Sequence, residues 1–139
     1  MITLINKLQL LQNACARFVS QRRKFDHISD VLKDLHWLPV KARINYKILT
    51  WVYKCLNGLA PTYLSDLLIV QDQSRTRRSV TQFNLRVPRI TKKNSGDRAF
   101  CVAGPLLWNR LPLDIKQSPT LDKFRRKLKT HLFIKSYGV

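Results

Sequence analysis

The sequence predicts a mainly α-helical fold, a small helical domain of about five helices with an irregular basic loop or short β segment at about 71–97. Apolar residues recur at helical spacing through most of the chain. With 45% hydrophobic residues, the 139-residue chain is long enough to bury one core. The exception is the polar and strongly basic stretch 71–97, where the helical spacing disappears.

The apolar spacing predicts each helix in turn. Within residues 1–70, helices are expected over about 2–20, 28–36, 40–57 and 61–69. Within residues 98–139, they are expected over about 98–110 and 119–134. Between these two helical regions, 71–97 is expected to form a basic loop or a short extended arm.

Three of the predicted helices have a well-defined apolar face. Helix 40–57 has the clearest pattern and should form the hub of the core, ending at Asn57-Gly58. Its expected buried stripe is Ile44, Ile48, Trp51, Val52 and Cys55. The first helix places on one face Leu4, Leu8, Leu11, Cys15, Phe18 and Val19, and the last helix places on one face Leu121, Phe124, Leu128 and Leu132.

A period of two replaces the helical period near residue 85. Phe83, Leu85 and Val87 alternate with polar residues or proline. This alternation predicts a short extended segment or an edge strand, because Pro88 is incompatible with a central strand.

The charge is the unusual feature of the composition. There are 26 Lys and Arg against 8 Asp and no Glu, which gives a net charge of +18. Such an excess repels itself in a compact state and favours a polyanionic partner. Nucleic acid is the first candidate, an anionic membrane surface the second and an acidic protein the third. A fragment cut from a larger protein is the alternative explanation.

The cations are densest in the basic stretch and in the last helix. Polar Ser, Thr and Asn side chains lie among them and add hydrogen-bond donors for phosphate oxygens. A solvated charged face is the alternative interpretation. The candidate nucleic-acid-binding residues are Arg75, Arg77, Arg78, Arg86, Arg89, Lys92, Lys93 and Arg98, supported by Arg126, Lys127 and Lys129.

The sequence offers no recognisable catalytic constellation. It lacks a Gly-rich phosphate loop, a nucleophile elbow and metal-type His/Cys spacing, so we expect no catalytic residues, no metal and no cofactor. Asp26, Asp30 and Asp34 are spaced to share a helix face, where a solvated face is favoured over a metal site. Three widely spaced cysteines predict reduced thiols packed in the core of an intracellular protein, in the nucleus or cytoplasm and not secreted. No apolar run reaches the length of a membrane span.

An ordered string of short motifs covers almost the whole chain. Its first members are Leu8–Ala14, Leu35-His36-Trp37-Leu38-Pro39-Val40, Arg43-Ile44, Tyr53-Lys54-Cys55-Leu56-Asn57-Gly58 and Ala60-Pro61-Thr62-Tyr63-Leu64. Its later members are Leu85-Arg86-Val87-Pro88-Arg89, Gly96-Asp97-Arg98-Ala99-Phe100, Pro105–Pro112 and Phe124–Lys129. This string resembles the C-terminal region, downstream of the reverse transcriptase domain, of non-LTR (LINE-class, jockey-like) retrotransposon polyproteins. The order of the motifs is specific, whereas each motif alone is not.

The resemblance implies a reverse transcriptase-like, transposable-element protein whose parent is an RNA-directed DNA polymerase. The adjacent aspartates of the polymerase metal site have no counterpart here, so the resemblance implies a non-catalytic segment and not an enzyme. We therefore expect binding of RNA template or target DNA, with weak sequence specificity and no small-molecule substrate. One alternative is a structural segment whose apolar stripes at 2–20 and 121–132 dock on a polymerase domain. Another is a decayed element copy with no independent activity.

Overall fold

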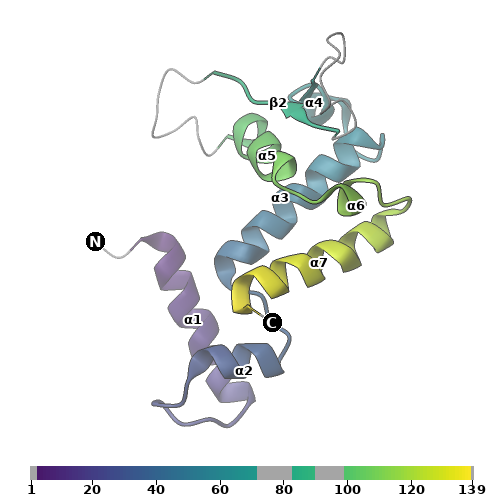
Figure 1. Cartoon of the computed structure of the whole chain (residues 1–139). Coiled ribbons are helices and arrows are strands. Elements are labelled where there is room, and N and C mark those ends of the chain that lie inside the picture. Colours follow the sequence, from purple (N-terminus) through teal and green to yellow (C-terminus); the bar gives the residue numbers. More distant parts are fainter. Residues whose placement is uncertain (1–2, 72–82, 90–98, 139) are drawn as a thin grey trace. The chain divides into compact units, whose positions relative to one another are not determined.

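The computed structural model describes residues 3–71, 83–89 and 99–138, and in them the chain is mainly helical, which confirms the predicted fold class. Seven helices and one two-stranded antiparallel sheet occur in these ranges (Figure 1). They are α1 (Leu4–Val19), α2 (Ile28–Asp34), α3 (Val40–Leu56), α4 (Thr62–Ser65), β1 (Ile69–Val70), β2 (Leu85–Arg86), α5 (Phe100–Asn109), α6 (Leu113–Lys116) and α7 (Leu121–Tyr137).

The chain comprises two compact units. The first unit is Met1–Tyr46 with Lys129–Val139, and the second is Lys47–Leu128. The boundary falls inside α3 and inside α7, so each of these helices contributes one end to each unit. The first unit thus combines two distant segments and the second is one continuous segment, whereas the sequence-based ranges were 1–70, 71–97 and 98–139.

The first unit has a small core between α1 and α2. Ala16, Val31 and Leu32 are buried there, and larger side chains such as Trp37 and Tyr137 pack around them. The Tyr137 hydroxyl donates a 2.6 Å hydrogen bond to the Trp37 carbonyl, 100 residues away in sequence. Burial raises the pKa of this tyrosine.

Helix α1 does not bury the face that its apolar pattern predicts. Its buried residues are Gln12 and Ala16. Gln12 Nε2 donates to the Leu38 carbonyl at 2.8 Å, and Gln9 Oε1 accepts the Val40 N–H at 2.8 Å. These glutamines satisfy backbone groups at the start of α3, which are costly to leave unpaired. The expected apolar face is therefore exposed, and its residues are Leu4, Leu8, Leu11, Cys15, Phe18 and Val19.

The second unit holds a larger core, organised around the C-terminal half of α3 and an aromatic cluster. The Tyr53 and Phe124 rings stack at 4.3 Å, and Trp108 lies 6.0 Å from Phe124. The Tyr53 hydroxyl donates to the Ser118 carbonyl at 2.7 Å, which satisfies its polar end. The predicted hub helix is therefore present as a core element of this unit.

The predicted stripe of the hub helix is wrong at two positions. Ile44 and Trp51 are exposed, whereas Leu49, Tyr53 and Thr50 are buried. The reason is that α3 carries apolar residues over most of its circumference, so that its pattern did not define a single buried arc. Trp51 instead lies under the Lys54 ammonium, which is 4.7 Å from its ring centroid.

Three helices end with the same backbone conformation. The residue after the C-cap has positive φ at Gln21 (+52°), His36 (+53°) and Gly58 (+68°). In each case the next N–H donates to a carbonyl five residues earlier, at 3.0, 2.9 and 2.8 Å. This is the Schellman arrangement, and it confirms the stop predicted at Asn57-Gly58.

Two predicted helix ranges need correction. The expected helix 61–69 is only the single turn α4, and Ile69–Val70 forms β1 instead. The last helix runs beyond 134 to Tyr137, and the single turn α6 precedes it without having been predicted. Gly104 and Pro105 both lie inside the continuous helix α5. There, a Cβ on Gly104 would come within 3.0 Å of Val52, so glycine permits close packing of α5 against α3.

Candidate nucleic-acid interface

The described portion of the predicted basic site is built on β2. Leu85 is 2% exposed and Arg86 is exposed, so the predicted alternation puts one residue inside and the next outside. β2 pairs antiparallel with β1, in the register Ile69 to Arg86 and Val70 to Leu85. A pair of two-residue strands is too short to hold itself together in water.

The side chain of Asn109 supplies the missing support. Gln71 N–H donates to the Asn84 carbonyl at 3.1 Å, so the neighbouring pair, Val70 and Leu85, is a pair without mutual hydrogen bonds. The Leu85 N–H and C=O therefore face the other edge of β2. There Asn109 Oδ1 accepts the Leu85 N–H and Asn109 Nδ2 donates to the Leu85 carbonyl, each at 2.8 Å.

Two further contacts fix the residues just before Leu85. Trp108 Nε1 donates to the Phe83 carbonyl at 2.8 Å, and Phe83 has a positive φ of +46°. Lys116 Nζ donates to Asn84 Oδ1 at 3.0 Å. Lys116 is only 9% exposed, and this burial lowers the pKa of its ammonium group.

The structure places the predicted cations unevenly. Arg86 and Arg89 are exposed on and just after β2. The chain enters β2 from residues 72–82 and leaves it toward residues 90–98, and these two segments hold most of the basic stretch. The predicted residues that lie outside the described residues are Arg75, Arg77, Arg78, Lys92, Lys93 and Arg98.

One of the predicted cations of α7, Lys127, makes contacts within the chain. Lys127 Nζ donates to the Asp114 carbonyl at 3.0 Å and lies 3.8 Å from its carboxylate, so this lysine ties α7 to α6. Arg126 and Lys127 belong to the same unit as Arg86, whereas Lys129 belongs to the other. Both members of the ion pair are well exposed, so it adds little stability.

Sequence reasoning missed the residues that build this site. No local sequence pattern marks these residues, because each forms a hydrogen bond with a residue more than twenty positions away. They are Asn109, Trp108 and Lys116. The only available signal was Trp108-Asn109 within the motif Pro105–Pro112.

Three sequence-based predictions concern metal ligands, cysteine thiols and membrane-spanning helices. No group of three or more His, Cys, Asp or Glu suited to a metal lies among the described residues. The thiols of Cys15, Cys55 and Cys101 are free. Cys55 is buried as expected, and its pKa is raised by burial, whereas Cys15 is exposed and not packed in the core. In the described ranges, no helix has the length and apolar character needed to span a bilayer.

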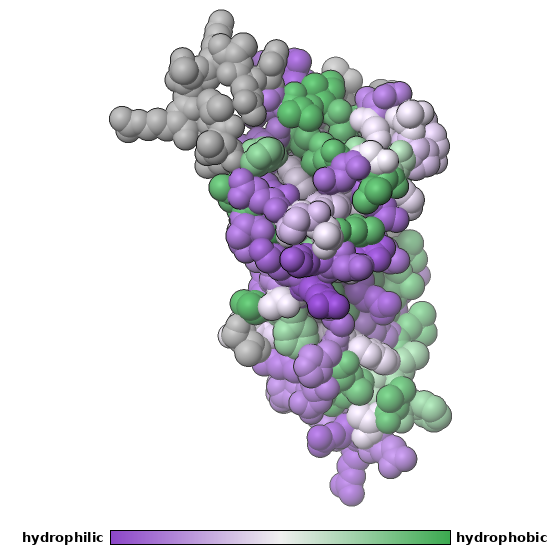
Figure 2. All heavy atoms as spheres, turned by 90° about the vertical axis from the view of Figure 1, so that its right-hand side faces the viewer, coloured by the Kyte–Doolittle hydropathy of each residue, from purple (hydrophilic) through white to green (hydrophobic). Residues whose placement is uncertain are grey.

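The surface mixes polar and apolar side chains. Figure 2 shows hydrophobic side chains lying among hydrophilic ones on the viewed face, in agreement with the many large apolar residues that are exposed. We found no match to the chain among protein-family models, curated proteins or solved structures. The functional interpretation therefore depends on the residues themselves.

Proposed function

We propose that the chain is a nucleic-acid-binding segment that holds RNA or DNA through phosphate contacts, with weak sequence specificity. The observation that carries the proposal is the anchoring of β2. Asn109 forms hydrogen bonds with Leu85 at one edge of β2, and strand β1 pairs with the other edge of β2. Two basic segments flank this fixed strand in the sequence, residues 72–82 before it and residues 90–98 after it.

The charge balance and the sequence resemblance add support. A net charge of +18 requires counterions, and their release on phosphate binding drives association. The resemblance to the tail of retrotransposon reverse transcriptases points to a template RNA or a target DNA as the polyanion. It also favours a non-catalytic role inside the cell, in the nucleus or cytoplasm.

The test is a salt-dependent titration of the full chain with single-stranded RNA and with duplex DNA. For about six contacts on a single strand, the log–log slope of affinity against salt should be about −4. Replacing Arg75, Arg77 and Arg78 together by Glu should weaken binding and flatten the slope by about 2. A matched variant carries the same charge change at exposed positions of α3, namely Lys41→Glu, Arg43→Glu and Lys47→Glu.

Each outcome decides the assignment of the site. A much larger loss in the first triple variant than in the α3 variant supports the basic stretch as the site. Equal losses would show that only net charge matters, and an unchanged affinity in the first variant would remove these arginines from the site. Circular dichroism of each variant checks that the helices are retained.

A second candidate function is docking on another protein, and one observation favours it. The apolar face of α1 is exposed, with Leu4 73% and Phe18 86% accessible. The apolar face of α7 was also expected to dock on another protein, but this face is already covered by the chain itself. Its residues Phe124, Leu128 and Leu132 are buried. Docking would therefore use α1 and not α7.

A further inference from the structure

Phe83 departs from the alternation of the strand that follows it. In an extended chain, residues two apart lie on the same face of the strand, which would place Phe83 beside the buried Leu85. Leu85 is 2% exposed, whereas Phe83 is 54% exposed. The departure coincides with the φ of +46° at Phe83, which lies outside the extended region. More than half of this side chain is therefore in solvent instead of in the core.

This placement of Phe83 is unfavourable for the folded chain by itself. A positive φ is uncommon for a bulky residue and costs conformational energy. Exposure of the ring also forgoes the stabilisation that burial of a large apolar side chain brings. Strained residues of this kind cluster at positions that bind ligands, and a binding role for the ring accounts for both costs.

The backbone at Phe83 is nevertheless well fixed. Trp108 Nε1 donates to the Phe83 carbonyl at 2.8 Å, and the Trp108 ring is itself buried. The next two residues are also held, each by hydrogen bonds from a side chain of α5 or α6. An exposed ring on a fixed backbone loses little conformational freedom when a flat ligand stacks on it.

Cations follow Phe83 along the same segment. Arg86 and Arg89 are exposed, and residues 83–89 contain no acid. The Cα atoms of Phe83 and Arg86 are at most about 11 Å apart, which is the span of three extended residues. An aromatic ring with cations nearby is the combination that binds single-stranded nucleic acid, because the bases stack on the ring while the cations contact the phosphates.

We propose that Phe83 is a stacking platform for one unpaired base of a single-stranded nucleic acid, with Arg86 and Arg89 on the phosphates of the same strand. The inference rests on the proposed nucleic-acid binding and narrows its ligand to a strand with unpaired bases. A duplex offers phosphates to the arginines, but its bases are already paired and stacked on one another. Phe83 should therefore add affinity for single strands and none for duplexes.

The probes carry the same phosphates with and without bases. The first is an oligothymidylate of about twelve nucleotides, a length within the usual range of single-strand binding sites. The second is an abasic strand with the same backbone and charge, and the third is a DNA duplex of equal length. The full chain is titrated with each probe by fluorescence anisotropy over a range of salt concentrations. The wild type should bind the oligothymidylate about tenfold more tightly than the abasic strand.

Three variants of Phe83 isolate the ring. Phe83→Ala should weaken oligothymidylate binding by about tenfold and change binding of the abasic strand and the duplex by less than about twofold. Phe83→Leu keeps an apolar side chain without a ring and should lose nearly as much. Phe83→Trp should retain the affinity, because the larger ring also stacks. The salt slope should stay the same in all three variants, since none removes a phosphate contact.

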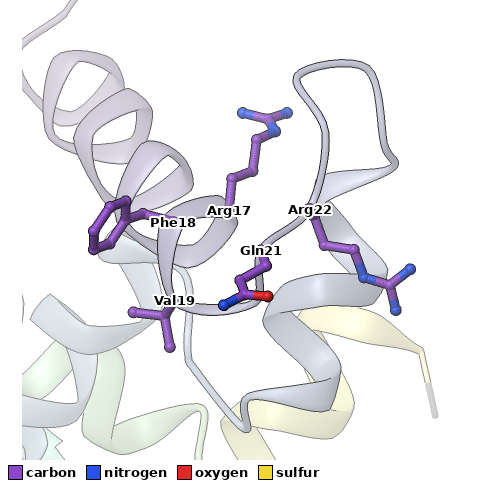
Figure 3. A pocket seen from close by; sticks show the side chains of 5 residues that line it. All are labelled: Arg17, Phe18, Val19, Gln21 and Arg22. Carbon is purple, nitrogen blue, oxygen red and sulfur yellow. The ribbon is translucent and has the colours of Figure 1, made fainter.

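The matched control is Phe18→Ala in the first unit. Phe18 is 86% exposed at the last turn of α1, where it lines an open hollow together with Arg17 and Arg22. Figure 3 shows its ring pointing away from the guanidinium groups of both arginines. This variant removes an exposed phenylalanine without removing the proposed platform, so oligothymidylate affinity should change by less than about twofold.

The outcomes separate this inference from the proposed function. If the wild type binds with the expected salt slope and Phe83→Ala leaves oligothymidylate affinity unchanged, stacking on Phe83 is overturned and phosphate binding remains. Equal losses on the oligothymidylate and the abasic strand would also overturn it, because the ring would then act only through the fold. A loss in Phe18→Ala as large as that in Phe83→Ala would remove the special role of Phe83. Failure of the wild type to bind any of the three probes would refute both proposals.

Discussion

Replacing Asn109 by Ala should detach β2 from α5. The change removes two hydrogen bonds of 2.8 Å to the Leu85 backbone, each with a net value of about 1 kcal/mol. Leu85 is 2% exposed, so water replaces those bonds incompletely, and an unsatisfied backbone group adds up to about 1 kcal/mol. The free energy of unfolding should therefore fall by about 2–3 kcal/mol.

The assay is urea unfolding followed by circular dichroism, with hydrogen exchange at the Leu85 amide as the local readout. The amide should exchange much faster in Asn109→Ala, because its acceptor is gone. Asn57→Ala is the matched control in the same unit, since it removes one bond from Asn57 Nδ2 to the Tyr53 carbonyl near the surface. The control should cost less than about 1 kcal/mol.

Asn109→Asp separates the donor from the acceptor. An ionised carboxylate still accepts the Leu85 N–H but repels the Leu85 carbonyl, so the variant should be unstable at neutral pH. Below about pH 4 the protonated carboxyl can donate again, and its deficit relative to the wild type should shrink. If Asn109→Ala lost no more stability than Asn57→Ala, or the Asp variant showed no such pH effect, the anchoring role of Asn109 would be refuted. If the proposed nucleic-acid binding depends on this anchor, Asn109→Ala should also bind RNA more weakly at unchanged net charge.

Two further predictions concern single residues. Burial lowers the pKa of Lys116, so the unfolded chain binds the Lys116 proton more tightly than the folded protein does. The contribution of this group to the free energy of unfolding therefore rises as the pH increases toward 10.5. Lys116→Met should remove that rise, and a difference from wild type in urea unfolding that stays constant with pH would contradict the prediction. Gln21 adopts φ +52°, a conformation that costs a non-glycine residue about 1 kcal/mol, so Gln21→Gly should raise the free energy of unfolding by up to about that amount. By the same reasoning, Gly58→Ala at φ +68° should lower the free energy of unfolding by about 1 kcal/mol. A Gln21→Gly variant less stable than wild type in thermal unfolding would show that its side chain contributes more than its backbone costs.

The sequence predicted the strand β2 better than its partner. Alternation around Leu85 indicated one inward and one outward residue, and Leu85 and Arg86 are arranged in that way. The partner β1 lies in the apolar run Leu67–Val70, which has no period and was assigned to a helix. Asn109 lies 24 residues from Leu85, and no local pattern reports a side-chain bond over that distance.

Helix α1 shows why an apolar pattern predicts a face and not its burial. The spacing of Leu4, Leu8 and Leu11 correctly indicated a helix, but these residues are exposed. The buried positions are set by Gln12, which meets a backbone carbonyl, and by Ala16, whose small side chain allows close approach to α2. Such long-range polar pairing depends on where α3 begins, and the local sequence of α1 contains no information about that point.

The motifs that carry the resemblance acquire a physical meaning from these contacts. Leu85–Arg89 and Pro105–Pro112 lie apart in sequence, yet Asn109 bonds to Leu85 and Trp108 bonds to Phe83, at the edge of the first motif. Tyr53, from a third motif, stacks on Phe124, from a fourth. These motifs therefore contain positions that pack on one another within the second unit. Six of the eleven cations proposed to bind phosphates lie inside motifs of the string, and the other five, Arg75, Arg77, Arg78, Lys92 and Lys93, lie between motifs. If the proposed binding is right, substitution of those five should change binding strength while removing none of the contacts that join the motifs.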